Sequence, residues 1–265
     1  MKPTQFNYLS EESAPYLRYT DFAGSPLNRN RLSCIVGMLE ACEATESIHS
    51  ILEVGCGIGN ICIPLASLGY DVKAIDIDGA STEIMLWKNP FDNLRVETLA
   101  VEDEDVGSYD VIVLTEVLEH VPNAEDFFRN IVRRMRPGTW MILTVPKGYG
   151  LCELVLRPGY SLKRSGKGLE MIKIIRRMLG TRELTTANVQ TPHLHFFTLK
   201  RINGFFERNH LQLISFHSIF FLWVLLESLF SANRLPASMA RWDYLLSQKL
   251  APAFCANWIF LQKTE

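Results

Sequence analysis

Short apolar runs alternate with segments of helical period along the first 146 residues. Continuous runs that fit buried parallel strands cover residues 51–54, 70–78, 94–101, 109–115 and 140–145. Between these runs, apolar side chains recur every three or four residues, which predicts helices over 61–68, 80–88 and 123–135. A further helix, with Ser25 as N-cap and Pro26 in its first turn, should precede the first strand. Strands that alternate with helices predict a doubly wound α/β fold.

The C-terminal part of the chain should complete this sheet. Thr198 can cap a helix, and strands are predicted over 211–217 and 257–262, with the last one pairing antiparallel at the sheet edge. The predicted fold is a mostly parallel seven-stranded sheet with helices on both faces and a substrate-covering insertion after the fifth strand. One domain is expected, and its parts are an N-terminal arm and helix (1–46), a core (47–146), a basic cap (147–192) and a C-terminal part (193–265).

Composition narrows the class of protein. The chain has 265 residues, 48% of them hydrophobic and 21% charged, which fits one large soluble α/β domain. A net charge of -2 gives no general attraction to nucleic acid. The six cysteines show neither a C-x-x-C pair nor zinc spacing, so reduced and mostly buried thiols are expected. The N-terminus lacks the pattern of a signal peptide, and we expect a cytoplasmic protein.

A glycine-rich turn, Glu53-Val-Gly55-Cys-Gly57-Ile-Gly59, follows the first strand. The dinucleotide fingerprint G-x-G-x-x-G fails because Asn60 stands at its third glycine, and no Gly-Lys-Ser/Thr follows as in a P-loop. An acid before the turn disfavours a pyrophosphate and suits a ligand with positive charge. A glycine turn without any ligand is the alternative interpretation.

The second strand carries acids at its end. Asp76 lies 21 positions beyond Gly55, where a carboxylate can accept hydrogen bonds from both hydroxyls of a ribose. By itself Asp76 would more often be a strand-end cap, but together with the glycine turn it favours ribose binding. A second acidic segment, 102–105, follows the third strand and also fits an exposed turn.

These motifs together resemble the class I S-adenosylmethionine (SAM)-dependent methyltransferases. The glycine turn, Asp76, the run 116–123 and the Arg136-Pro137-Gly138 turn carry the resemblance over residues 50–146. The segment 191–198 is similar to the tail of small-molecule members, including the ubiquinone-pathway O-methyltransferases. The resemblance implies that the cofactor SAM binds at Glu53, Gly55, Cys56, Gly57, Gly59, Asp76, Ile77, Glu102 and Glu116. Ile77 would pack on the adenine, whereas the acid for the adenine amino group falls on Val101, Glu102 or Asp103.

The resemblance also indicates the catalytic residues. Glu116 would lie beside the reacting methyl, and His120 is the candidate base or substrate orienter because imidazole titrates near neutral pH. His195 is favoured over His193, although either histidine could simply be hydrogen-bonded at a helix start. Glu116, Glu119, His120 and His195 also resemble a set that binds Mg²⁺ or Mn²⁺ in some relatives. The same string occurs where no metal is needed, so the metal is the less favoured alternative and no metal ligand is predicted.

The acceptor is harder to define. Between 157 and 182 there are eight basic residues and one acid, Glu170, and three interpretations stay open: a cap that attracts an anionic acceptor, a face that rests on an anionic membrane, or a solvated helix face. The apolar stretch 213–230 fits a strand followed by a helix; peripheral membrane contact or a groove for a lipid is the alternative.

The predicted function is methyl transfer from SAM to a small or lipid-linked acceptor, at oxygen. The alternatives are aminopropyl transfer on the same scaffold and a catalytically silent SAM-binding subunit of a partner. A nucleic-acid substrate is disfavoured because the basic residues are confined to one segment and no RNA-binding motif accompanies them. The sequence leaves the oligomeric state open.

Overall fold

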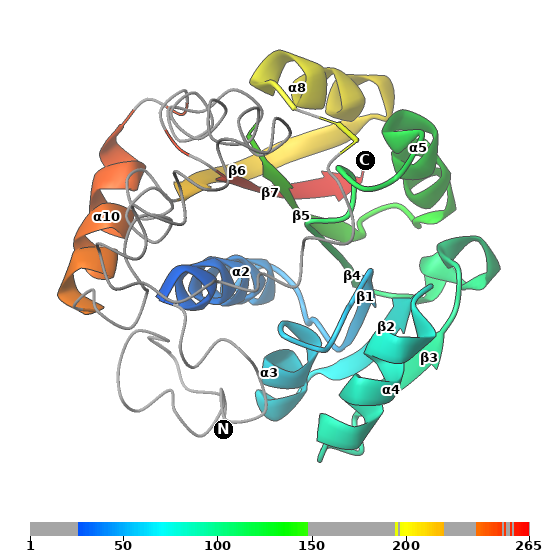
Figure 1. Ribbon diagram of the computed structural model, residues 1–265. Coiled ribbons are helices and arrows are strands. Elements are labelled where there is room, and N and C mark those ends of the chain that lie inside the picture. The colour runs from blue at the N-terminus through cyan, green and yellow to red at the C-terminus, as the bar shows by residue number, and fades with distance from the viewer. Residues whose placement is uncertain are drawn as a thin grey trace, which may run out of the picture.

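The protein folds around one seven-stranded sheet (Figure 1). The computed structural model describes residues 26–147, 194–195, 197–219, 237–250, 252, 255 and 257–264. The strands are β1 (Ser50–Val54), β2 (Asp71–Asp76), β3 (Leu94–Thr98), β4 (Val111–Thr115), β5 (Trp140–Pro146), β6 (Leu211–Ile219) and β7 (Asn257–Thr264). Their order is β3-β2-β1-β4-β5-β7-β6. The first five are parallel, and β7 is antiparallel to β5 and β6, which confirms the predicted fold class.

Helices cover both faces of the sheet (Figure 1). They are α2 (Pro26–Glu43), α3 (Cys62–Ser67), α4 (Gly79–Lys88), α5 (Ala124–Arg134), α8 (Leu199–Arg208) and α10 (Ala237–Lys249), with 3₁₀ turns η3 (Val101–Asp103) and η4 (Val106–Ser108). The α2 and α3 helices pack on one face, and α5 and α8 pack on the other. The α10 helix, which the sequence analysis did not predict, lies against β6 and α2.

The strands are apolar on both sides because both sides are covered. In β1, Ile51 joins the apolar cluster under α2, whereas its neighbour Leu52 joins the cluster under α5. Phe128 of α5 packs on Phe205 of α8 with ring centroids 5.7 Å apart. Full burial of each of these phenylalanine side chains contributes about 1.5–3 kcal/mol to the stability of the fold. The five cysteines that the structure describes are free and buried, as predicted.

Three details of the predicted strands were wrong. The strand 257–262 does not form the sheet edge, because β7 lies between β5 and β6, and β6 is the edge strand. The first six residues of β7 are buried, as an interior strand requires, whereas Leu213 and Ile214 of β6 are exposed. The third strand ends at Thr98 rather than at Val101, because the chain turns into η3 and buries Val101 beneath that turn. Similarly, β2 ends at Asp76, and Asp78 caps α4.

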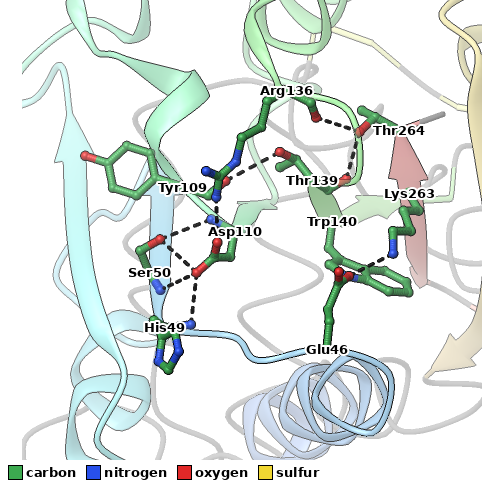
Figure 2. A network of polar contacts seen from close by, with 10 residues as sticks. All are labelled: Glu46, His49, Ser50, Tyr109, Asp110, Arg136, Thr139, Trp140, Lys263 and Thr264. Carbon is green, nitrogen blue, oxygen red and sulfur yellow. Dashed lines mark hydrogen bonds and ion pairs between the residues drawn. The ribbon is translucent and has the colours of Figure 1, made fainter.

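A polar network ties together the amino ends of the central strands (Figure 2). The Asp110 carboxylate accepts from the N–H groups of His49 and Ser50, both at 2.9 Å, and pairs with Arg136 at 2.6 Å. Beside it, Glu46 accepts from the Trp140 indole and from Lys263. This network lies at the opposite end of the strands from the glycine turn, so it stabilises the sheet and leaves the carboxyl edge open.

Several predictions fall outside the described residues. They concern the arm before Pro26, Cys152, the basic cap with its substrate-covering role, His193, and the apolar stretch beyond Ile219 up to residue 236; they stay predictions. Among the described residues, no helix combines the length and the apolar character needed to cross a membrane.

Candidate functional site

The glycine turn lies at the carboxyl end of β1 and depends on backbone that only glycine adopts easily. Gly55, Gly57 and Gly59 have φ values of 72°, 52° and 87°. A Cβ added at Gly55 would lie 2.4 Å from the Val117 side chain, so a larger residue does not fit. A Cβ added at Gly59 would likewise lie 2.6 Å from the Met85 side chain. Around the Cβ position of Gly57, by contrast, no heavy atom of the described residues other than its two chain neighbours lies within 4 Å. At Gly57 the turn therefore presents bare main chain to open space.

Asp76 is fixed directly beside this open space. Its Oδ2 accepts from the Gly57 N–H at 2.7 Å, and its Oδ1 accepts from the Asp78 N–H at 2.9 Å. The carboxylate is half-buried at the end of β2. Ile77, which follows it, is 80% exposed, an unusual position for a large apolar side chain beside a polar edge. The two predicted ribose and adenine residues thus lie together at one edge of the sheet.

Glu53 occupies a different position from the other predicted cofactor residues. Its side chain is buried, and Oε2 accepts from the Cys62 N–H at 2.9 Å at the start of α3. Burial raises the pKa of Glu53 to about 8, against the hydrogen bond from Cys62. Burial likewise raises the pKa of the neighbouring Cys56 thiol. Glu53 therefore joins the strand before the glycine turn to the start of α3. With its pKa raised to about 8, the carboxyl is protonated over part of the neutral range.

The turn η3 resolves which acid faces the sheet edge after β3. Val101 is buried in the core, so it cannot present a polar group to a ligand. Glu102 and Asp103 are exposed and follow it in the turn. The sequence left three positions open, and the structure reduces them to these two acids.

Glu116 ends the fourth strand in a strained conformation with its carboxylate fully engaged. It has a φ of 54°, which costs about 1–3 kcal/mol in a residue with a side chain. Thr144 donates to Oε1 at 2.8 Å, and the Asn257 amide donates to Oε1 and Oε2 at 3.0 and 2.9 Å. The guanidinium of Arg31 lies 3.4 Å from Oε2. Three elements, α2, β5 and β7, thus hold this carboxylate, which follows β4 directly.

Glu119 lies beneath Glu116. Both Glu119 oxygens are buried and accept no hydrogen bond within the described residues, and the nearest cation site is the Nε2 of His120 at 3.8 Å. Burial first, and the neighbouring Glu116 second, raise the pKa of Glu119 to about 9, although Arg31 opposes this. Glu119 is therefore mainly neutral at pH 7.

His195 is joined to the same turn from the other side. Its ring Nε2 lies 3.0 Å from the Pro122 carbonyl and donates to it, and the N–H groups of Leu194 and His195 both donate to the Glu119 carbonyl. The structure thus brings Glu116, Glu119, His120 and His195 to one region. No group of three or more His, Cys, Asp or Glu in the described part of the chain has metal-site geometry.

Sequence analysis missed three residues that hold Glu116, namely Arg31, Thr144 and Asn257. They come from the N-terminal helix, the fifth strand and the last strand. Asn257 is a polar residue at the start of a largely buried strand, and it is 8% exposed. A polar residue in a buried strand was the signal that could have marked Asn257.

Comparison with known proteins identifies the class. The family model described as "Methyltransferase domain" matches residues 15–215. The chain therefore belongs to this family, and its sheet order and glycine turn are those of the class I SAM-dependent methyltransferases.

Particular relatives share part of the chain. The ubiquinone biosynthesis O-methyltransferase of Rickettsia typhi is 35% identical over 121 residues, which is 44% of this chain and 49% of that protein. Its counterpart in Rickettsia bellii is 33% identical over 123 residues, 45% and 51% of the two chains. The chain thus spans about half the length of the curated relatives it matches.

Among solved structures, the fold is similar to that of magnesium protoporphyrin IX methyltransferase from Synechocystis, solved with bound S-adenosylhomocysteine (SAH). The TM-score is 0.58 at 14% identity over 97% of both chains. A putative sarcosine dimethylglycine methyltransferase from Galdieria sulphuraria gives a TM-score of 0.54 at 13% identity, over 89% of this chain and 85% of that one. At these identities the likeness concerns the fold.

Proposed function

We propose that this protein transfers the methyl group of SAM to a small or lipid-linked acceptor, at oxygen. The observation that carries the proposal is the open space before Gly57 with the Asp76 carboxylate beside it. A ligand entering that space meets bare main chain, a carboxylate suited to vicinal hydroxyls, and then the apolar side chain of Ile77. These three features of the protein are complementary to the parts of a nucleoside, in the same order.

The residues around the turn would each contact a part of SAM. Asp76 would accept from the ribose hydroxyls, Ile77 would cover one face of the adenine, and Glu102 or Asp103 would accept from its amino group. The backbone of Gly55, Cys56, Gly57 and Gly59 would let the ligand approach closely. Glu53 would act through the turn that it holds, since its carboxyl is buried.

SAM supplies a methyl group on a positively charged sulfur, which is already activated for in-line displacement. The protein must then align the acceptor and exclude water. Glu116, immobilised by Asn257 and Thr144, provides a fixed negative charge at the end of β4. His120 would take the proton from the acceptor hydroxyl, or orient it, while His195 holds the turn that carries His120.

The proposal that the acceptor atom is oxygen rests on the names of the relatives. The curated proteins with about one third identity are named ubiquinone biosynthesis O-methyltransferases, and a ubiquinone precursor would be a lipid-linked phenol. Because the match covers about half of those proteins, the acceptor itself is part of the proposal.

The test measures binding and turnover separately. Calorimetry with SAH should give a dissociation constant in the micromolar range, and incubation with SAM and a panel of catechols and prenylated phenols should yield SAH and a methyl ether. Methylthioadenosine as the product of a decarboxylated SAM analogue would indicate aminopropyl transfer instead. SAH binding without turnover, together with copurification of an active partner, would favour the silent subunit. Absence of SAH binding contradicts the proposal.

The same assay decides the place of a metal. We expect turnover to be unchanged by a chelator, in keeping with the prediction that the metal is the less favoured alternative. Activity that collapses in chelator and returns with Mg²⁺ or Mn²⁺ would assign Glu116, Glu119 and His120 to a metal instead.

A further inference from the structure

Arg134, near the end of α5, reaches across to the turn η3 with its whole guanidinium. Nη2 donates to the Val101 carbonyl at 2.8 Å, and Nη1 donates to the carbonyls of Glu102 and Glu104 at 3.2 and 3.0 Å. Its Nε donates to the Asn130 carbonyl of its own helix at 3.2 Å, which fixes the direction of the side chain. The planar fork of arginine suits several carbonyls at once, whereas a lysine offers a single ammonium.

Two of these carbonyls also have main-chain donors: Val101 accepts from the Glu104 N–H at 3.3 Å, and Glu104 accepts from the Val106 N–H at 3.0 Å. Arg134 therefore adds a second donor to these two carbonyls and also holds the Glu102 carbonyl between them. The turn begins just after Thr98, the end of β3. The backbone register pairs that end with the end of β2, where Thr98 lies opposite Asp76.

A second set of contacts fixes the far side of the turn. The Glu104 carboxylate accepts from the Tyr109 hydroxyl at 2.8 Å and lies 3.9 Å from the Lys73 ammonium. Glu104 is held by its side chain, and Val101 is buried. The turn has its own main-chain bond from the Asp103 N–H to the Ala100 carbonyl, and Arg134 adds side-chain bonds on both sides of Asp103, to the carbonyls of Glu102 and Glu104.

We propose that Arg134 is a positioning residue for recognition of the base: it holds η3 so that Glu102 or Asp103 meets the amino edge of the adenine. This inference rests on the proposed function, since it requires that a nucleoside lies along the ends of β2 and β3. Arg134 lies on α5 and does not touch the ligand, yet through η3 it sets the preference for adenine.

The test compares SAH with S-inosylhomocysteine, in which a carbonyl replaces the amino group of the base. The variant is Arg134→Lys, and the matched control is Arg133→Lys, an exposed neighbour on the same helix that makes none of the bonds to η3. Both substitutions keep the charge. Dissociation constants for the two nucleosides are measured by calorimetry, and Tm is measured alongside.

The wild-type protein and Arg133→Lys should bind SAH at least about tenfold more tightly than S-inosylhomocysteine, because an acid that accepts from an amino group repels a carbonyl oxygen. Arg134→Lys should weaken SAH binding about tenfold and S-inosylhomocysteine binding less than about threefold, so that the preference shrinks. Arg134→Gln should repeat this loss of preference, which keeps the test independent of the folding of one variant.

Several results overturn the inference. One is a ratio of the two affinities that is unchanged in both Arg134 variants. If both nucleosides lose affinity equally and Tm is lower, Arg134 only stabilises the fold, and the inference is also overturned. Another is a wild-type protein that binds the two nucleosides equally. A wild-type protein that binds neither contradicts the proposed function itself, and is thereby distinguished from failure of the Arg134 step.

Discussion

Asn257 and Glu116 are 141 positions apart in the chain, and the amide of the first donates to both carboxylate oxygens of the second. This contact joins the interior strand β7 to the end of β4. It makes the position of Glu116 depend on the last strand of the sheet.

Replacing Asn257 should therefore affect catalysis more than cofactor binding. Asn257→Leu removes both hydrogen bonds from the amide and leaves Thr144 and Arg31 as the remaining partners of Glu116. With the carboxylate held less firmly, we expect kcat to fall about tenfold or more while the dissociation constant of SAH changes less than about threefold. Asn209→Ala, at the end of α8, is the control. A kcat that stays at the wild-type value would show that the Glu116 carboxylate needs no fixed position.

The second prediction concerns Asp76. Asp76→Ala removes the acceptor for the ribose and the two main-chain hydrogen bonds of the carboxylate, so SAH affinity should fall at least about tenfold while the protein stays folded. Asp71→Ala, at the exposed start of the same strand, should leave affinity unchanged. Calorimetry that finds equal affinities for Asp76→Ala and the wild-type protein would count against the nucleoside site.

The third prediction is a pH dependence that comes from Glu53. Its pKa is raised to about 8 in the folded state by burial, so the folded protein binds a proton that the unfolded chain has released. The stabilising effect is complete below the usual pKa of the carboxyl, about 4.5, and is lost as pH rises through 8.

In urea unfolding between pH 5.5 and 8, Glu53→Gln should therefore gain stability relative to the wild-type protein. The gain is at most about 1.4 kcal/mol per pH unit, the limit for one proton. The exposed Glu83→Gln should follow the wild-type curve. Parallel curves for Glu53→Gln and wild type would mean that Glu53 is ionised in the folded state.

The network in Figure 2 gives an opposite pH dependence through Asp110. Partial burial disfavours its ionised form, but the N–H groups of Ser50 and His49 and the Arg136 guanidinium outweigh this and lower the pKa of Asp110. Its stabilising effect is thus present above the usual pKa of about 3.8 and lost as pH falls through the lower folded value.

Asp110→Asn should cost about 1–3 kcal/mol of unfolding free energy at pH 7, and the difference from wild type should shrink below pH 4. The exposed Asp92→Asn should change stability by less than about 0.5 kcal/mol. A cost for Asp110→Asn that is the same at pH 7 and at pH 3 would show that ionisation of Asp110 plays no part.

The fifth prediction concerns a polar side chain in the core. Gln262 of β7 is fully buried, and neither Oε1 nor Nε2 has a hydrogen-bond partner among the residues that the structure describes. Gln262→Met keeps the length of the side chain and removes the unmet desolvation cost, so the unfolding free energy should rise by about 1–2 kcal/mol. Gln212→Met, on the exposed part of β6, should have little effect. A loss of stability in Gln262→Met would indicate a buried partner for the amide.

Much of the nucleotide-side architecture could be predicted from the chain itself. The apolar runs, the glycines at 55, 57 and 59, and Asp76 are encoded locally, because strand burial, positive φ and a strand-end acid each leave a signature within a few residues. Parallel strands then bring the glycine turn and Asp76 to one edge, where the structure finds them 2.7 Å apart.

The surroundings of Glu116 and of η3 depend on contacts between distant segments, and only the tertiary structure decided them. The place of β7 inside the sheet, the contacts of Arg31 and Asn257 with Glu116, and those of Arg134 with η3 each join segments with no local pattern in common. The sequence indicates which local structure a segment prefers. Whether a polar group is buried against a remote partner depends on the whole packing, and this is why burial raises the pKa of Glu53 and of Glu119 in a way that the side-chain type alone would not indicate.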